Sequence, residues 1–391
     1  MRDSEPVNSG DLSKDVRDNI DEFESVAGFE ALSRSTLKCI KGVLWKDTPA
    51  HYYLNNIEEN LVLERQLQNG KYKQKKPKKF KVYYPKERDI VSVHFRDRVF
   101  QRSLNDNILY PKISRSFIYD NMACQKGKGP DLAWERLKCF LQRFYRKHGT
   151  QGYVLKCDIK GYYPNMSHKV VKDCFHKVID GWTYKQAVCI LDGQYDHEIG
   201  FNPGSQMIQI AGIGILNALD HFIKEELHIK HYIRYMDDFI LIHEDKQYLL
   251  ECQVRIAQML QGLECQFNTK KTGISPLSDG ILFLGFHYRL TKSGKVIMTL
   301  NSANIKHERK KLCKLVHLAK KGLRTKEKVD ECYRDWKNHA AKGNSKQLLQ
   351  RMDEYYRSLW KEADSNAQRE TDLGVPDRQT RKCFRHRRTD G

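Results

Sequence analysis

The chain has 391 residues, of which 40% are hydrophobic, so it can bury a large core in two or three domains and is not a disordered protein. Its net charge is +20, and because residues 1–30 hold nine acidic and three basic residues, the rest of the chain carries +26. That surplus is typical of a nucleic-acid partner, since Lys and Arg contacts to phosphates release condensed counterions. No apolar run approaches the roughly 20 residues that span a bilayer, and the N-terminus lacks the apolar region of a signal peptide, so we expect a cytoplasmic protein with no membrane partner.

Eleven cysteines are an odd number, and no C-x-x-C pair occurs among them. This spacing argues against a disulfide framework and against a structural zinc site. We therefore expect reduced cysteines.

The first half of the chain mixes helical and strand patterns. Residues 1–33 form an acidic segment whose polar start predicts a mobile arm or a docking segment, and residues 35–67 show a helical pattern. Seven lysines between Lys71 and Lys81 form either a solvated face or a phosphate-binding surface. Residues 80–93 alternate as strands do around a turn at 85–87, and helical patterns follow over residues 94–148.

In the second half, residues 153–159 predict a strand, residues 217–227 a helix and residues 231–243 a hairpin. A strand pair is expected over residues 280–300 with a turn at 291–294, followed by basic amphipathic helices over 302–360 and a basic tail. Helices and strands alternate without a regular βαβ repeat, which favours the α+β class.

Two acidic clusters fall at strand ends. Asp237-Asp238 is the only Asp-Asp pair in the chain and joins two short apolar strands, while Asp158 ends another. Acids are common in turns, but adjacent carboxylates repel each other unless a divalent cation lies between them. If the strands are neighbours, Asp158 and Asp237 can share two Mg²⁺ ions that activate a primer 3′-hydroxyl and stabilise a leaving pyrophosphate.

The string Tyr235-Met236-Asp237-Asp238 resembles the Y-x-D-D motif of reverse transcriptases, and residues 158–164 resemble the first catalytic motif of that family. The resemblance continues in order over residues 80–300. It implies an RNA-directed DNA polymerase with a right-hand fold, in which fingers, palm and thumb surround an antiparallel palm sheet. It also makes Asp158, Asp237, Asp238 and the backbone carbonyl of Ile159 the ligands of two Mg²⁺ ions, with Mn²⁺ as an alternative in vitro.

The resemblance implies further contacts to the nucleotide. Tyr163 matches the side chain that stacks under the incoming sugar and excludes a 2′-hydroxyl, although a core tyrosine is the alternative. Residues 199–206 resemble the template and nucleotide-contact motif. The full set of implied nucleotide contacts is Lys86, Arg88, Lys128, Tyr163, Gly200, Ser205, Gln206 and Met236.

Three of these residues, Lys86, Arg88 and Lys128, would offer cations to the triphosphate. Many relatives carry Arg-Pro where this chain has Gln125-Lys126, which departs from the family pattern. Downstream, residues 267–272 resemble the motif whose lysine protonates pyrophosphate; Lys271 is the expected acid and Lys270 the alternative. Residues 283–286 resemble the primer grip.

The implied division of the chain is an acidic arm at 1–33, N-terminal helices and fingers at 34–150, palm at 151–300, thumb at 301–365 and basic tail at 366–391. Expected partners are template RNA, in the form of a dedicated noncoding RNA, primer and product DNA, deoxynucleoside triphosphates and an accessory protein subunit.

Ile199 and Gln206 resemble the reverse transcriptases of diversity-generating retroelements and related bacterial or phage lineages, including antiviral defence enzymes. A retroelement role and a defence role both stay open, as does protein-primed or template-independent synthesis. A non-catalytic RNA-binding scaffold is disfavoured because all three acidic positions hold Asp.

Overall fold

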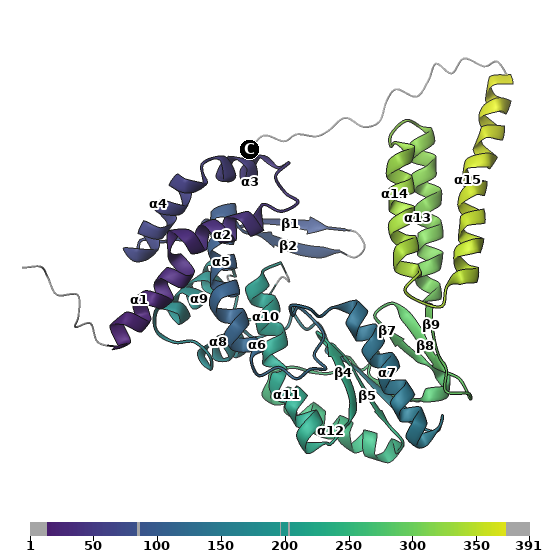
Figure 1. Cartoon of the computed structure of the whole chain (residues 1–391), viewed down its shortest axis with the longest axis horizontal. Coiled ribbons are helices and arrows are strands. Elements are labelled where there is room, and N and C mark those ends of the chain that lie inside the picture. The colour runs from purple at the N-terminus through teal and green to yellow at the C-terminus, as the bar shows by residue number, and fades with distance from the viewer. Residues whose placement is uncertain (1–13, 84–86, 196, 202–203, 373–391) are drawn as a thin grey trace, which may run out of the picture. The chain divides into compact units, whose positions relative to one another are not determined.

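The computed structural model describes residues 14–83, 87–195, 197–201 and 204–372, and the chain divides after Asp279 into two compact units (Figure 1). Helices and antiparallel sheets occur together, which confirms the α+β class. Within the described part of the chain, no helix is both long and apolar enough to cross a membrane. Every cysteine among these residues is free.

The N-terminal helices of unit 1 pack into its core. These helices are α1 (Lys14–Ala27), α2 (Phe29–Cys39), α3 (Asp47–Leu54), α4 (Asn56–Gln68) and α5 (Phe95–Leu104). The expected mobile arm over residues 1–33 is therefore wrong for its second half. Phe23, Val26 and Ala27 recur at helical spacing on one face of α1, and Phe23 packs edge-on against Trp182 at 5.1 Å between ring centroids. Residues 1–13 lie outside the described residues.

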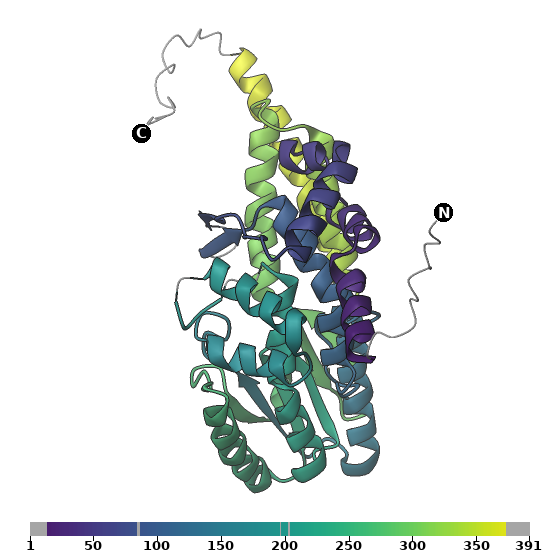
Figure 2. The same cartoon turned by 90° about the vertical axis from the view of Figure 1, so that its left-hand side faces the viewer.

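Strands β1 (Lys78–Val82) and β2 (Arg88–Ser92) form an antiparallel hairpin that projects from the helices of unit 1 (Figure 2). All five residues of β1 are exposed, so its lysines face solvent. The expected strands at residues 80–93 are confirmed, while most of the expected turn lies outside the described residues.

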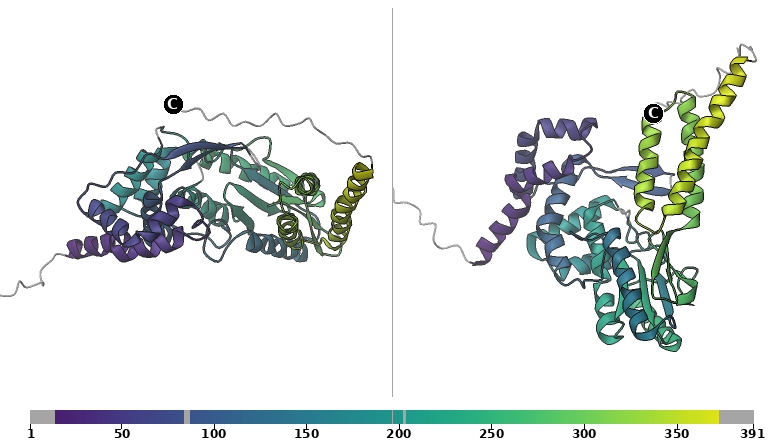
Figure 3. Two further views of the ribbon diagram at one scale, coloured as in Figure 1. Left: turned by 90° about the horizontal axis from the view of Figure 1, so that it is seen from above. Right: turned by 45° about the vertical axis from the view of Figure 1, so that its right-hand side comes forward.

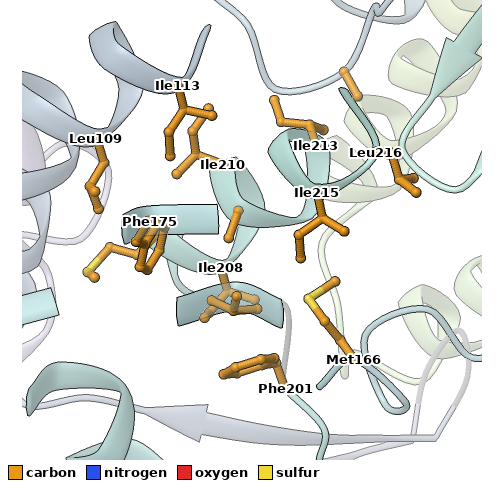
Figure 4. Close-up of a cluster of buried hydrophobic side chains, with 14 of the residues drawn as sticks. Leu109, Ile113, Met166, Phe175, Phe201, Ile208, Ile210, Ile213, Ile215 and Leu216 are labelled. Carbon is orange, nitrogen blue, oxygen red and sulfur yellow. The ribbon is translucent and has the colours of Figure 1, made fainter. Parts of the chain in front are cut away.

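A second group of helices surrounds the apolar helix α10 (Gln206–Ile215), as Figure 4 shows for the side chains around Ile208 and Ile213. Seven of the ten residues of α10 are buried. A helix that is apolar on nearly all sides is expected to be buried in this way. The other elements of this group are the π-helix η1 (Asn105–Leu109), α6 (Tyr110–Ser114), α8 (His168–His176), α9 (Gly181–Gln194), α11 (Asn217–His221) and the π-helix η2 (Phe222–Glu226).

The central sheet of unit 1 has four antiparallel strands in the order β4-β5-β3-β6. Their bounds are β3 (Tyr153–Asp158), β4 (His231–Tyr235), β5 (Asp238–His243) and β6 (Gly273–Pro276). Helix α7 (Pro130–His148) packs against β4, and α12 (Lys246–Gly262) packs against β3, β5 and β6. The hairpin at residues 231–243 and the strand starting at Tyr153 are confirmed, and β3 lies next to β5 as the acidic cluster requires. The short helix η3 (Leu277–Asp279) ends the unit.

Unit 2 begins with a three-stranded antiparallel sheet, β7 (Ile281–Phe283), β8 (Phe286–Leu290) and β9 (Val296–Leu300). The strand pair expected at residues 280–300 is thus three strands, because Leu284 and Gly285 both adopt positive φ and add a tight turn. Helices α13 (Ser302–Lys320), α14 (Lys326–Ala340) and α15 (Lys346–Asp372) follow, and α13 packs against both of the others (Figure 3). Leu312, Tyr333 and Met352 form the core between these helices.

Candidate active site

Two of the three predicted acids face each other across neighbouring strands. Asp158 is the last residue of β3, Asp238 is the first residue of β5, and the antiparallel register pairs them directly. Directly paired residues place their side chains on the same face of a sheet, about 4.5–5.5 Å apart at Cβ. The apolar residues that follow Asp238, from Phe239 to Ile242, are all buried and hold the strand in place. The fold therefore brings the two carboxylates to one end of the sheet.

Asp237 lies beside them in the two-residue turn between β4 and β5. Its turn partner Met236 has a φ of 58°, a region that hairpins of this length usually fill with glycine. A non-glycine residue there costs on the order of 1–3 kcal/mol and persists only where the surroundings hold it. The Met236 sulfur lies 3.9 Å from the Cys124 sulfur, and Cys124 also has a positive φ.

A buried ion pair next to this turn donates a hydrogen bond to its backbone. Arg234 of β4 and Asp220 of α11 are both 0% exposed. The guanidinium donates Nε to Asp220 Oδ1 at 2.7 Å and a second bond to Oδ2, while Nη1 donates to the Met236 carbonyl at 3.0 Å. Nη2 also reaches the carbonyl of Ile213 at 3.1 Å, and Tyr232 donates its hydroxyl to Asp220. No sequence pattern singles out this pair.

The surroundings of the two hairpin acids, Asp237 and Asp238, disfavour their charged forms. Burial raises the pKa of Asp238 to about 6, with the charges of Asp158 and Asp237 adding to the shift and Lys156 opposing it. Burial and the Asp158 charge also raise the pKa of Asp237. Asp238 Oδ1 is buried and has no hydrogen-bond partner among the described residues. Carboxylates with raised pKa values that lie side by side are typical of functional sites.

Two lysines contact the carboxylate cluster. Lys271 Nζ lies 2.9 Å from Asp158 Oδ2, and Lys156 Nζ lies 3.5 Å from Asp238 Oδ2. The hydrogen bond to Asp158 raises the pKa of Lys271. Of the two lysines that the sequence offered at positions 270 and 271, the structure brings Lys271 to the acids, while Lys270 is exposed and bonds through its backbone to Asn268.

Further contacts orient Asp158. Asn268 Nδ2 donates to Asp158 Oδ1 at 2.9 Å, and the Thr272 hydroxyl accepts from the Asp158 backbone nitrogen at 3.1 Å. The sequence motif marks Asn268 and Thr272 only as neighbours of Lys271. It does not mark Lys156, although the place of this lysine two residues before Asp158 on a strand puts it on the same face of the sheet.

The donor chemistry of this cluster fits divalent cations such as Mg²⁺, which prefer carboxylate and carbonyl oxygens. Among the described residues, however, no three His, Cys, Asp or Glu side chains are arranged to hold a metal ion. In the structure, the ammonium groups of Lys271 and Lys156 contact one carboxylate oxygen each of Asp158 and Asp238.

The backbone carbonyl of Ile159 faces the hairpin side of β3. The backbone carbonyl of Asp158 accepts a hydrogen bond from the Asn268 nitrogen at 2.7 Å. The Lys160 nitrogen donates to the backbone carbonyl of Gln266 at 2.9 Å, so both bonds run toward residues 266–268. Carbonyl directions alternate along an extended strand, so the Ile159 carbonyl points to the opposite side, where Asp237 lies. This direction fits the predicted ligand.

Tyr163 packs close to the carboxylates. Its hydroxyl is buried without a hydrogen-bond partner among the described residues, and a Cβ added to Gly212 of α10 would lie 3.1 Å from it. Burial raises its pKa, and the charges of Cys124 and Asp237 add to the shift. The ring therefore lies between α10 and the hairpin turn, partly open to solvent.

Gly200 and the pair Ser205-Gln206 lie on either side of residues 202–203, which are outside the described residues. Gly200 has a φ of 100°, and its backbone N–H donates to the Met166 carbonyl. A Cβ atom at this position would lie only 2.8 Å from the Pro164 carbonyl oxygen. Ser205 and Gln206 begin α10 and line a separate polar cavity.

The three cations expected at a triphosphate have different surroundings. Lys86 lies outside the described residues. Arg88 is exposed at the start of β2 and pairs with Val82. Lys128 donates to the carbonyls of Ile118, Tyr119 and Asn121 at 2.8–3.4 Å, and burial lowers its pKa. Its contacts in the structure are therefore to backbone oxygens.

No family model and no curated protein matches the chain. Solved structures do resemble it. Telomerase from Candida albicans in complex with a TWJ fragment of telomeric RNA matches at a TM-score of 0.45 and 12% identity over 66% of this chain and 55% of that one. Apo telomerase from Candida tropicalis, truncated from its C-terminal domain, matches at 0.43 and 15% over 62% and 60%, and apo telomerase from the same organism at 0.41 and 15% over 63% and 53%. The chain thus spans little more than half the length of these neighbours.

Proposed function

We propose that this chain is an RNA-directed DNA polymerase that adds deoxynucleotides to a primer 3′ end. The observation that carries the proposal is the direct pairing of Asp158 with Asp238 across β3 and β5, with Asp237 in the adjoining turn. Three carboxylates at one end of an antiparallel sheet, two of them with raised pKa values, support a site that divalent cations would complete.

In this proposal Asp158, Asp237, Asp238 and the Ile159 carbonyl hold two Mg²⁺ ions. Bound ions would lower the pKa of the primer 3′-hydroxyl and stabilise the leaving pyrophosphate. Lys271 keeps a proton on Nζ, because its pKa is raised by Asp158, and it can give that proton to pyrophosphate.

The nucleotide would bind against Tyr163, whose ring would then exclude a ribose 2′-hydroxyl, as the family resemblance implies. Met236 precedes the metal-binding acids in the turn and would contact the same nucleotide. Arg88 on the projecting β1–β2 hairpin is exposed and available to a triphosphate, as the family resemblance implies.

The nucleic acid would be held by the basic surface of the chain. Net charge is +20, and the lysines of β1 are exposed. The right-hand arrangement would assign the β1–β2 hairpin to the fingers, the four-stranded sheet to the palm and α13–α15 to the thumb. The proposed partners are template RNA in the form of a dedicated noncoding RNA, primer and product DNA, deoxynucleoside triphosphates and an accessory protein subunit.

The biological setting that we favour is a bacterial or phage retroelement, on the strength of Ile199 and Gln206 in the fourth motif. An antiviral defence enzyme would use the same catalytic centre. Sequencing the RNA that copurifies with the chain separates the two, since a retroelement enzyme should carry RNA from a template repeat that lies beside a variable gene.

The test removes one negative charge at a time while keeping side-chain shape. Asp237→Asn and Asp238→Asn should each lower primer extension on an RNA template by at least about 100-fold, because each loses a cation ligand. Glu251→Gln, which removes an exposed acid from α12, is the matched control and should extend normally.

Melting temperatures separate a catalytic role from a structural one. Both Asp→Asn variants should melt at or above the wild-type temperature in EDTA, because each removes a carboxylate whose pKa is raised by burial and by the neighbouring acids. Normal extension by both variants would refute the proposed site. A large drop in melting temperature would show that the acids stabilise the fold instead.

A further inference from the structure

A polar cavity of about 380 Å³ lies in unit 1 among α2, α5, α9 and the first turn of α10. Ligand cavities typically measure about 300–1,000 Å³, so it can hold a small molecule or one unit of a polymer. Val91, Val93 and Tyr195 supply an apolar wall, while the rest of the lining is polar or charged.

Two buried amide nitrogens on this lining have no hydrogen-bond partner among the described residues. Gln101 of α5 is 5% exposed and Gln194 of α9 is 3% exposed, and both line the cavity. The Nε2 atom of each is buried without a hydrogen-bond partner among the described residues. Native proteins rarely leave buried donors unpaired, so two of them on one cavity point to a ligand that accepts hydrogen bonds.

The charges around the cavity indicate that the ligand is an anion. Lys38, Arg98 and Arg102 all line it. Lys38 and Arg102 share a single acid, Asp106, at 2.7 and 2.8 Å, so the lining keeps a positive surplus. Arginine forks and lysine ammonium groups are the side chains that proteins use most for phosphate.

Helix α10 contributes its N-terminus to the same lining. Ser205 is its N-cap residue, and the serine side chain makes no capping hydrogen bond. The backbone amides of the first turn therefore lack a side-chain acceptor, and the helix dipole favours negative charge at this end. The cavity thus combines two amide donors, three cations and a helix N-terminus.

We propose that this cavity binds the phosphate of a nucleotide, with the sugar or base against the apolar wall. The carboxylate cluster is a different site. Gly212, six residues along α10 from Gln206, contacts Tyr163, so the cavity lies about 9 Å along the same helix from the wall behind that tyrosine. The ligand is either a free mononucleotide or one nucleotide of a bound RNA strand, since both present the same phosphate chemistry.

The experiment titrates the full-length chain in EDTA with AMP and, separately, with a short fluorescent single-stranded RNA. Arg98→Gln removes a cation of the lining, and Gln194→Leu removes an unpaired donor. Arg34→Gln is the matched control, because Arg34 on α2 is 62% exposed at its side chain and pairs with Glu30 outside the cavity. Melting temperatures are recorded with and without each probe.

We expect both cavity variants to weaken binding of the probe about tenfold or more, while Arg34→Gln binds as wild type does. Without a probe, Gln194→Leu should melt no lower than wild type, because the donor it removes is unpaired. If the cavity variants lose AMP binding, the ligand is a free nucleotide. If wild type does not bind AMP and the cavity variants lose RNA binding, the ligand is one nucleotide of an RNA strand.

Three results would overturn the proposal. These are binding of neither probe to wild type, unchanged affinities in both cavity variants, and an equal loss in Arg34→Gln. The titration in EDTA needs no catalysis, so a failed polymerase test with Asp237→Asn leaves its result unaffected.

Discussion

The buried pair of Arg234 and Asp220 allows a quantitative test of how the hairpin turn is held. Asp220→Asn keeps the shape of the acid and removes its charge, which leaves a guanidinium that is 0% exposed without a counter-ion. Removing one partner of a buried ion pair typically costs about 3–5 kcal/mol. We expect the free energy of unfolding of unit 1 to fall by that amount, because solvent cannot reach Arg234 to compensate.

The double variant Arg234→Met/Asp220→Asn separates the cost of an unpaired charge from the value of the pair. Arg234→Met alone leaves Asp220 buried and charged, whereas the double variant leaves no charge, and Tyr232 can still donate its hydroxyl to the amide oxygen that replaces the carboxylate. Replacing a buried pair by neutral groups is often close to neutral. The double variant should therefore lose at least about 2 kcal/mol less than the sum of the single losses.

Urea unfolding followed by tryptophan fluorescence measures these differences. Asp192→Asn is the matched control, since Asp192 pairs with Lys172 at 2.7 Å but has a side chain that is 52% exposed. We expect it to cost at most about 1 kcal/mol. Additive losses in the double variant, or an Asp220→Asn variant as stable as wild type, would refute the reasoning.

Three other outcomes can be checked. Tyr163→Ala should raise the efficiency of ribonucleotide relative to deoxyribonucleotide incorporation, and an unchanged ratio in a well-folded variant would place the nucleotide elsewhere. The folded pKa of Asp238, about 6, exceeds its usual value of 3.8, so this group favours folding more as the pH falls through 6. The melting temperature in EDTA should therefore rise relative to that of Asp238→Asn across this range, while Mg²⁺-dependent extension falls; parallel melting curves would contradict this. RNA affinity should drop steeply between low and physiological salt, and a flat dependence would assign the basic surface another role.

The sequence predicted the strands that carry the acids, because short apolar runs ending in acids are a local signal. It could not predict the buried ion pair of Arg234 and Asp220 that stabilises the turn between these strands. Asp220 lies between Leu219 and His221 in a short helix, where an acid usually faces solvent, and its pairing with Arg234 depends on how α11 packs under β4. Contacts between elements distant in sequence leave no periodic trace.

Two other differences have similar physical causes. The acidic composition of residues 1–30 suggested an arm, yet Phe23, Val26 and Ala27 alone make one face of α1 apolar enough to pack. Lys128 suggested a phosphate ligand from its place in a motif. That role stays a prediction; in the structure the ammonium donates to backbone carbonyls of the irregular segment that contains Tyr119 and Asn121, contacts that no sequence pattern specifies.

Three departures from ordinary local structure occur at or near one turn. Met236 has a positive φ, Tyr163 has a buried hydroxyl without a partner among the described residues, and Asp238 has a carboxylate oxygen in the same state. A poorly folded region would show such features together with loose packing, but β4 and β5 are buried and fully paired, and Arg234 binds the Met236 carbonyl. Unfavourable local conformations persist where the surrounding structure over-determines them, and they cluster where ligands bind. The strained turn, the raised carboxylate pKa values and the unpartnered oxygens therefore lie together in one rigid part of the sheet, which is where the proposed function would place the cations and the nucleotide.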